Sequence, residues 1–332
     1  AYTLTATFSC TPVPLSLDSD RGIWPPYMDL PIVRKAYAMM LAYTDPSFAA
    51  AQAEAQSAIA EARAQEGENT NRHLGRMGTG VRQHVENIYA LVRVADEIVD
   101  GPATEAGLDT IGAGRALNEL ERETEHAMET GFSSNLVVHA FALTAREVNF
   151  GSELTAPFFD SMRMDLSEKE HDQASFDRYV YGSAEVVGLM CLEAFLQGVE
   201  VSPEEKERMV TGARALGAAF QKVNFLRDLA ADFETLGRSY FPGVDVDTFT
   251  EADKLRLLDD IDADLRVSAA VVPDLPATSR RAVALAQSLF AELSVRLRAT
   301  PAAQLVRARV RVPNPVKARL ALVAALGGKP QQ

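Results

Sequence analysis

Hydrophobic residues recur at a helical period along most of the sequence. From Val81 to Asp100, apolar residues return every three or four positions, which places them on one face of a helix. They are Val81, Val85, Ile88, Leu91, Val92, Ala95 and Val99. Gly101 and Pro102 end this helix, because neither residue readily continues helical backbone. Strand-like alternation is nearly absent, so the pattern predicts an all-α protein.

The same pattern predicts helices over most of the remaining sequence. Their predicted ranges are 32–43, 46–65, 104–130, 134–149, 153–167, 172–199, 203–235, 278–299 and 315–326, with another helix beginning at 250. Ser202 and Glu205 form the sequence signature of a capping box at the start of the helix from 203. Gly131 and Gly151 are placed to act as helix C-caps.

Composition and charge exclude several classes of function. The chain has 332 residues, of which 47% are hydrophobic, enough for a large buried core. Its net charge of -13 argues against nucleic acid as a partner, because phosphate binding requires a basic surface. Cys10 and Cys191 lie far apart without other metal-ligand residues at suitable spacing, and we interpret Cys191 as a core residue.

The sequence also carries expectations about location. No basic segment followed by an apolar one marks the start, and no uncharged apolar run approaches the roughly 18 residues that span a bilayer. We therefore expect a cytoplasmic protein. A basic segment near the C-terminus, 306–319, could touch a membrane surface or a diphosphate. We favour the alternative that it is a solvated segment that pairs with the acidic body of the protein. Its charges are Arg307, Arg309, Arg311, Lys317 and Arg319.

Two predicted helices carry paired carboxylates. Asp96 and Asp100 are four residues apart, as are Asp228 and Asp232, so each pair lies on one helix face. Like charges at this spacing destabilise a helix by a few tenths of a kcal/mol. Two such pairs in otherwise apolar helices indicate a compensating cation. Carboxylate oxygens suit Mg²⁺, which keeps several waters and bridges to substrate phosphates.

Other polar residues accompany the two pairs. Asn224 lies one turn before Asp228, and Gln221 lies beside the same face. The candidate diphosphate ligands, chosen because arginine binds phosphate through two parallel hydrogen bonds, are Arg93, Arg227 and Arg238, together with Tyr240. The alternative interpretation is that these arginines only pair with neighbouring acids.

This arrangement predicts the ionisation of an allylic diphosphate. Diphosphate becomes a good leaving group once metal ions neutralise the charge that develops on its oxygens. The carbocation left behind requires an apolar, aromatic pocket that excludes water until an acceptor attacks.

The residues around the aspartates resemble the squalene/phytoene synthase family. Tyr89–Asp100 is similar to the first aspartate-rich motif of that family and Gln221–Asp232 to the second. Further similar segments are Ser239–Pro242, Tyr179–Gly188 and Met162–Leu166. The resemblance implies one isoprenoid-synthase helical bundle around a central cavity. It would be a single domain over 1–332 with a divergent N-terminal segment, 1–65.

The resemblance also implies roles for individual residues. Mg²⁺-diphosphate, with two or three ions, would be bound by Asp96, Asp100, Asp228 and Asp232, with Asn224 as a further metal ligand. The residues near the diphosphates would be Tyr89, Arg93, Arg227 and Tyr240. Tyr181 and Gln221 would line the cavity.

One segment departs from the family pattern. Members that join two prenyl diphosphates usually carry a Ser-x-Ser-Phe-like element before the first aspartate helix, whereas residues 68–74 here read Glu-Asn-Thr-Asn-Arg-His-Leu. We therefore favour transfer of a short prenyl group to an aromatic, carbazole-type small molecule, as in one branch of the family. The alternative is head-to-head condensation of two prenyl diphosphates to a phytoene- or squalene-type product.

Overall fold

The computed structural model describes the chain from residue 79 onward, with gaps. The described ranges are 79–100, 103, 105–168, 170–236, 240–307, 310–313, 316 and 319–320, with only the backbone described for 230–236. The chain divides into two units, Ala1–Glu66 and Gly67–Gln332, and every described residue belongs to the second. The predicted helices 32–43 and 46–65, and most of 315–326, lie outside the described residues. The single domain over 1–332 stays a prediction.

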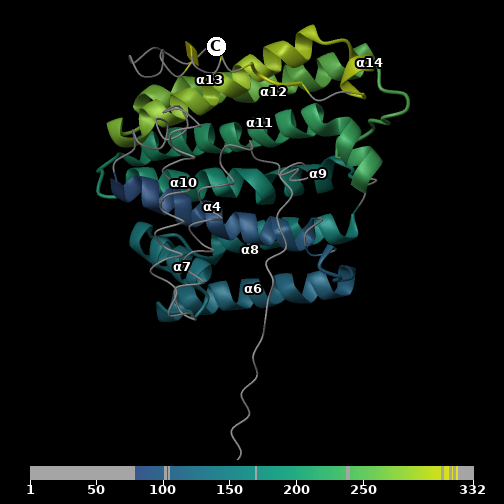
Figure 1. The fold of residues 1–332 in the computed structure, drawn as a ribbon. Coiled ribbons are helices and arrows are strands. Elements are labelled where there is room, and N and C mark those ends of the chain that lie inside the picture. Colours follow the sequence, from purple (N-terminus) through teal and green to yellow (C-terminus); the bar gives the residue numbers. More distant parts are fainter. Residues whose placement is uncertain are drawn as a thin grey trace, which may run out of the picture. The chain divides into compact units, whose positions relative to one another are not determined.

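Every regular element in the described ranges is helical, which confirms the predicted fold class (Figure 1). A first group packs around α4 (Thr79–Val99) and comprises α6 (Thr110–Thr130), α7 (Leu136–Val148), α8 (Ser152–Ser167) and α10 (Val186–Leu196). The predicted apolar stripe of α4 faces this group, and Leu91 and Ala95 are buried in its core. Full burial of a side chain such as Leu91 contributes about 1.5–3 kcal/mol.

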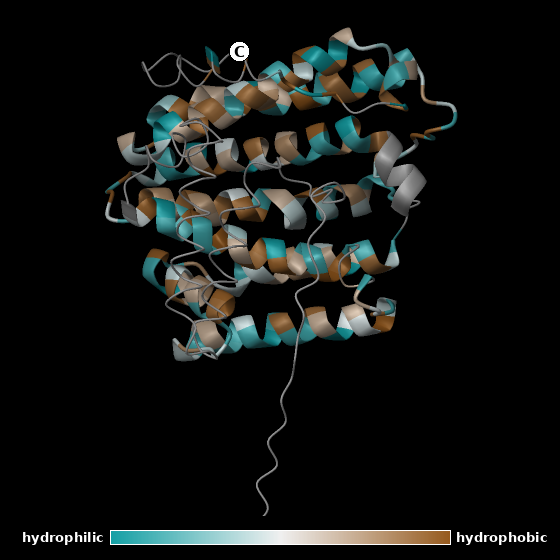
Figure 2. Ribbon diagram, in the orientation of Figure 1, coloured by the Kyte–Doolittle hydropathy of each residue, from teal (hydrophilic) through white to brown (hydrophobic). Residues whose placement is uncertain are grey.

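A second group packs around the long helix α11 (Pro203–Leu236). It comprises α9 (Gln173–Val180), α12 (Glu251–Val271), α13 (Ala277–Ala299) and the short α14 (Ala302–Leu305), which the sequence pattern did not predict. The 3-10 turn η2 (Val272–Asp274) joins α12 to α13. In Figure 1, α4 and α10 lie between α6–α8 and α11–α14. Polar and apolar residues alternate along these helices in Figure 2, as amphipathic packing requires.

The predicted helix 172–199 contains an irregularity. It consists of α9, a π-helical turn η1 (Tyr181–Glu185) and α10, which follow one another without a break. Gln173–Leu196 is long and apolar enough to cross a membrane by length and composition, and half of its most apolar window is buried in the structure. Core helices pass the same test, so this finding is weak support for a membrane span.

The helix caps follow the sequence in two places and differ in a third. Gly131 has a left-handed φ of 83° and ends α6, as predicted. At the start of α11, the Ser202 amide donates to Glu205 at 2.8 Å and the Glu205 amide donates to the Ser202 hydroxyl at 3.2 Å. The prediction that Gly151 is a C-cap is wrong. Asn149, with a φ of 64°, ends α7, because asparagine also tolerates left-handed backbone, and Gly151 precedes α8.

We expect the thiol of Cys191 to be nearly inert in the folded protein. Cys191 packs against two of the hydrophobic clusters, and burial raises the pKa of its thiol to about 12. Because the thiolate is the reactive form, alkylation at pH 8 should be at least roughly a thousandfold slower than for an ordinary cysteine. Mass spectrometry after iodoacetamide treatment, with denatured protein as the control, measures this. Rapid labelling of the native protein would contradict the assignment to the core.

Candidate active site

The first aspartate pair lies at the C-terminal end of α4. Asp96 is buried, with 9% of its surface exposed, and Asp100 follows the helix with its amide donating to the Asp96 carbonyl at 2.9 Å. Burial raises the pKa of Asp96 well above its usual range, and the charge of Asp100 raises it further. Arg93 lowers the pKa of Asp96, whereas Asp165 and Glu97 raise it. Negative charge is therefore concentrated around a carboxyl group that water reaches poorly.

Asp165 on α8 connects the aspartate pair to two tyrosines. The hydroxyl of Tyr179 donates to both carboxylate oxygens of Asp165, at 2.9 and 3.0 Å, and the hydroxyl of Tyr240 lies 3.4 Å from Oδ1. Burial and then the Asp165 charge raise the pKa of Tyr179 well above its usual value, so its hydroxyl stays a donor. This carboxylate holds α8, α9 and the segment after α11 together.

Aromatic rings continue from these tyrosines to α11. The rings of Tyr240 and Phe225 stack with centroids 4.0 Å apart and an interplanar angle of 8°. The ring of His171 also stacks with that of Tyr240, with centroids 5.9 Å apart and an interplanar angle of 12°. Phe225 directly follows Asn224 in the second motif. Contacts therefore run from Asp165 through Tyr240 to Phe225 of the second motif, and the charge of Asp165 also acts on Asp96 at the end of α4.

The second motif has its own internal pairing on α11. Arg227 donates to both carboxylate oxygens of Asp228, at 3.1 and 2.7 Å, and both side chains are largely buried. On α4, Arg93 forms an ion pair with Glu97. In the structure both arginines therefore pair with neighbouring acids, as the alternative interpretation of the sequence states. Their contact with a diphosphate stays a prediction.

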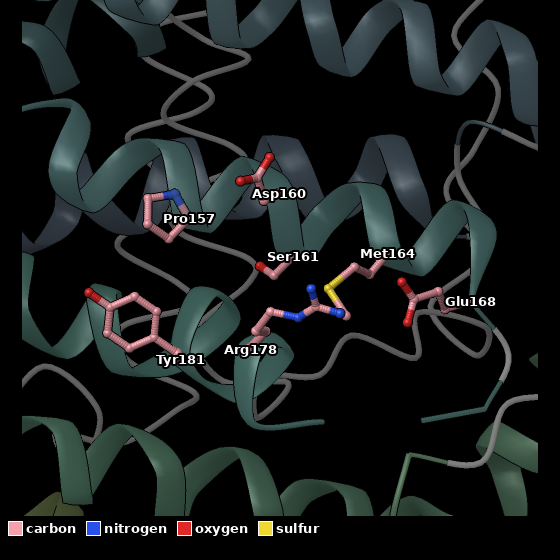
Figure 3. A pocket seen from close by; sticks show the side chains of 7 residues that line it. All are labelled: Pro157, Asp160, Ser161, Met164, Glu168, Arg178 and Tyr181. Atoms are coloured by element: carbon pink, nitrogen blue, oxygen red, sulfur yellow. The ribbon is translucent and has the colours of Figure 1, made fainter. Parts of the chain in front are cut away.

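The remaining predicted residues occupy several elements. Tyr89 lies on α4, Gln221 and Asn224 lie on α11, and Tyr181 begins η1. Tyr181 lines a cavity of about 320 Å³ between α8 and the α9–η1 segment (Figure 3). Asp232 lies on α11, but its side chain is outside the described part of the protein, as is Arg238. No role of these residues is tested by the structure, and each stays a prediction.

The oxygen donors of the site suit Mg²⁺. The amide oxygen of Asn224 is buried and has no hydrogen-bond partner among the described residues, and the charge of Asp100 acts on the Asp96 carboxyl. A hard cation would bind the Asn224 amide oxygen and would relieve the repulsion between Asp96 and Asp100. Within the described ranges, no three His, Cys, Asp or Glu side chains are grouped to hold an ion alone. Mg²⁺ completes its shell with water and substrate phosphate, so a full protein cage is unnecessary.

Sequence reasoning missed the Asp165 cluster. Asp165 lies in the segment Met162–Leu166 and Tyr179 in the segment Tyr179–Gly188, both of which are similar to the family, but the resemblance implies no role for either residue. The available signal was a single carboxylate between the apolar residues Met164 and Leu166. Its partners are 14 and 75 residues away along the chain, which no local pattern indicates.

The fold and site together define an all-α protein with one aspartate motif at the end of α4, a second on α11, and a buried aromatic cluster that links α8 and α9 to α11. The family model of squalene/phytoene synthase matches residues 77–315. The 15-cis-phytoene synthase of Paracoccus sp. (strain N81106 / MBIC 01143) is 26% identical over 238 residues, covering 67% of this chain and 75% of that protein. The chloroplastic phytoene synthase of Daucus carota is 31% identical over 167 residues, covering 48% of this chain and 39% of that protein.

Solved structures agree on the fold. The squalene synthase HpnC of Alicyclobacillus acidocaldarius superposes with a TM-score of 0.59 at 20% identity, covering 71% of this chain and 89% of that one. A dehydrosqualene synthase in complex with a ligand gives a TM-score of 0.60 at 22% identity, covering 80% and 93%. The chain belongs to the squalene/phytoene synthase family. Members of this family are prenyltransferases that act on prenyl diphosphates, and this chain is a prenyltransferase.

Proposed function

We propose that this enzyme condenses two prenyl diphosphates head-to-head into a phytoene- or squalene-type hydrocarbon. One observation carries the proposal: both aspartate motifs lie inside residues 77–315, the range that matches the family, whose aligned bacterial relatives are named phytoene synthases. The comparisons support this reaction better than the aromatic transfer that the segment 68–74 suggested. That segment lies outside the described residues.

The side chains of the site have distinct tasks in this reaction. Asp96, Asp100, Asn224, Asp228 and Asp232 would hold Mg²⁺ against the diphosphate, and the bound ions would supply the charge neutralisation that makes diphosphate a leaving group. The Asp165–Tyr179–Tyr240 cluster keeps the segment after α11 in place beside them. The stacked rings of Phe220 and Phe290, with centroids 3.7 Å apart, offer an apolar aromatic surface, and Phe220 precedes Gln221 in the sequence. Such a surface shields a carbocation from water.

The products provide the test of the proposed reaction. We expect purified full-length protein with Mg²⁺ to convert farnesyl or geranylgeranyl diphosphate alone into a hydrocarbon of twice the carbon number. A phytoene-type product requires the release of two diphosphates and two protons and needs no reductant, whereas a squalene-type product needs an added hydride donor. Gas chromatography with mass spectrometry identifies the hydrocarbon, and a phosphate assay counts the diphosphate released.

The second candidate is prenylation of an aromatic small molecule. It is motivated by residues 68–74, which lack the Ser-x-Ser-Phe-like element that helps to hold a second diphosphate. In that reaction a carbazole or indole ring carbon captures the cation, one diphosphate is released and one ring proton is lost. A product that forms only after an aromatic acceptor is added, with one diphosphate released per product, would overturn the condensation and support this alternative.

The cytoplasmic location and the contact of the segment 306–319 with a membrane surface stay predictions.

A further inference from the structure

The π-helical turn η1 brings an ion pair to the ring of Tyr181. Arg214 on α11 donates through Nε to the Glu185 carboxylate at 2.6 Å, and its guanidinium carbon lies 5.2 Å from the centroid of the Tyr181 ring. Tyr181 and Glu185 are the first and last residues of η1. Residues four apart lie on the same side of a helical turn, so both reach the same arginine. π-helical turns occur frequently at functional sites.

Close backbone contacts fix this group of three residues. A Cβ atom on Gly217 of α11 would lie 2.5 Å from the Ala184 carbonyl oxygen in η1, and one on Gly188 would lie 2.7 Å from the Ala213 carbonyl oxygen. The two segments can approach this closely only because both residues are glycines. Arg214 thus projects from a helix whose distance to Tyr181 is set by backbone contact.

Tyr181 also belongs to the wall of the cavity of about 320 Å³. In Figure 3, its ring and Pro157 lie at one side of this cavity, and Arg178 extends toward Met164. The cavity residues are Pro157, Asp160, Ser161, Met164, Glu168, Arg178 and Tyr181. Arg214 does not belong to this lining. The Tyr181 ring therefore has a guanidinium as one neighbour and a cavity as another.

A guanidinium beside this ring has opposing effects. It holds the ring in a fixed orientation through a cation–π contact. However, a positive charge next to a ring that faces an allylic cation would raise the energy of that cation. Glu185 removes the conflict, because its carboxylate is only 15% exposed and neutralises Arg214 in place.

We propose that Glu185 neutralises Arg214 beside the Tyr181 ring and thereby keeps the arginine from repelling the carbocation. This inference rests on the proposed function, since it requires a cationic intermediate beside Tyr181. An allylic cation on another face of the ring would lie roughly 10 Å from the guanidinium. At that distance an uncompensated charge corresponds to a loss of about tenfold in rate.

The test compares Glu185→Gln, Arg214→Met and the double variant by diphosphate release from farnesyl and geranylgeranyl diphosphate. We expect Glu185→Gln to lower kcat about tenfold with little change in KM, because the charge acts on the cation and not on substrate binding. Adding Arg214→Met to Glu185→Gln should restore most of that loss, since the uncompensated charge is gone. If the ion pair only held the two segments together, the double variant would be no faster than Glu185→Gln, because Arg214→Met cannot restore an ion pair that Glu185→Gln has already broken.

A neighbouring ion pair supplies the matched control. Lys206 of α11 contacts Glu193 of α10 at 3.0 Å, with side chains 47% and 22% exposed, against 50% and 15% for Arg214 and Glu185. Glu193→Gln and Lys206→Met should leave kcat within about twofold of the unmodified enzyme, as usual for exposed pairs. An equal loss in Glu193→Gln and Glu185→Gln would overturn the proposal.

Other outcomes are also decisive. The proposal fails if Glu185→Gln keeps the normal kcat, or if the double variant is no faster than Glu185→Gln. If Glu185→Gln does not fold, Arg214→Met alone is the test, with a loss below about fivefold expected and a larger loss contradicting the proposal. An unmodified enzyme that releases no diphosphate from either substrate would overturn the proposed function itself, which separates the two failures.

Discussion

Replacing Asp96 by asparagine is expected to lower the rate of diphosphate release by about two to three orders of magnitude. Asp96 is buried at the end of α4 and lies within the electrostatic influence of Asp100 and Asp165. Asparagine has the same shape but lacks the charge that attracts Mg²⁺ to the diphosphate. The rate of diphosphate release at saturating Mg²⁺ and prenyl diphosphate measures the effect.

The stability of this variant separates lost chemistry from lost structure. Because the pKa of Asp96 is raised on folding, its ionised form at neutral pH destabilises the folded state, and asparagine removes that cost. We therefore expect the metal-free variant to melt at the same temperature as the unmodified protein or higher. The rise in melting temperature on adding Mg²⁺ and inorganic diphosphate should largely disappear in the variant.

An exposed carboxylate on α6, Glu119, provides the control for the same change of charge. Glu119→Gln should leave both the rate and the stabilisation by Mg²⁺ unchanged. The role of Asp96 would be refuted if Asp96→Asn kept more than about a tenth of the rate of diphosphate release. The loss would then be far smaller than that expected for a charged group at the reacting diphosphate.

Replacing Gly182 by alanine is expected to lower the free energy of unfolding by about 3 kcal/mol. An added Cβ would lie 2.2 Å from the Pro157 carbonyl oxygen and 2.8 Å from the Ser161 Cβ. The first of these atoms belongs to the backbone of α8, so no side-chain rotation removes the clash. The turn η1 would have to move away from α8, and Tyr181 would move with it. Chemical denaturation measures the loss of stability.

Gly114 on α6 is the matched control, because it is also a helical glycine. Its added Cβ would meet only the Leu166 Cδ1 atom, at 3.7 Å, which is an ordinary contact. Gly114→Ala should therefore stabilise the protein by about 0.5–1 kcal/mol, since alanine favours helical backbone more than glycine does. Equal stability changes in the two variants would show that the close contact of η1 with α8 does not constrain position 182.

Local sequence patterns were sufficient for most of the helices. The apolar stripe from Val81 to Val99 defined α4 and its buried face, because a helix repeats about every 3.6 residues. The Ser202–Glu205 capping box formed where the sequence placed it, because its donors and acceptors are three residues apart. The choice between Asn149 and Gly151 as a C-cap could not be made this way, since both residues permit left-handed backbone.

By itself, the sequence determined the all-α class, most helix boundaries and the placement of one aspartate pair at the end of α4 and the other on α11, since all of these depend on neighbours within a few residues. Only the tertiary structure decided which polar and aromatic side chains contact one another. It joined Asp165 to Tyr179 and Tyr240, and Arg214 to Tyr181 and Glu185. Such partners are set by how helices pack against one another, and glycine contacts such as that of Gly182 with α8 adjust that packing. No local period encodes them.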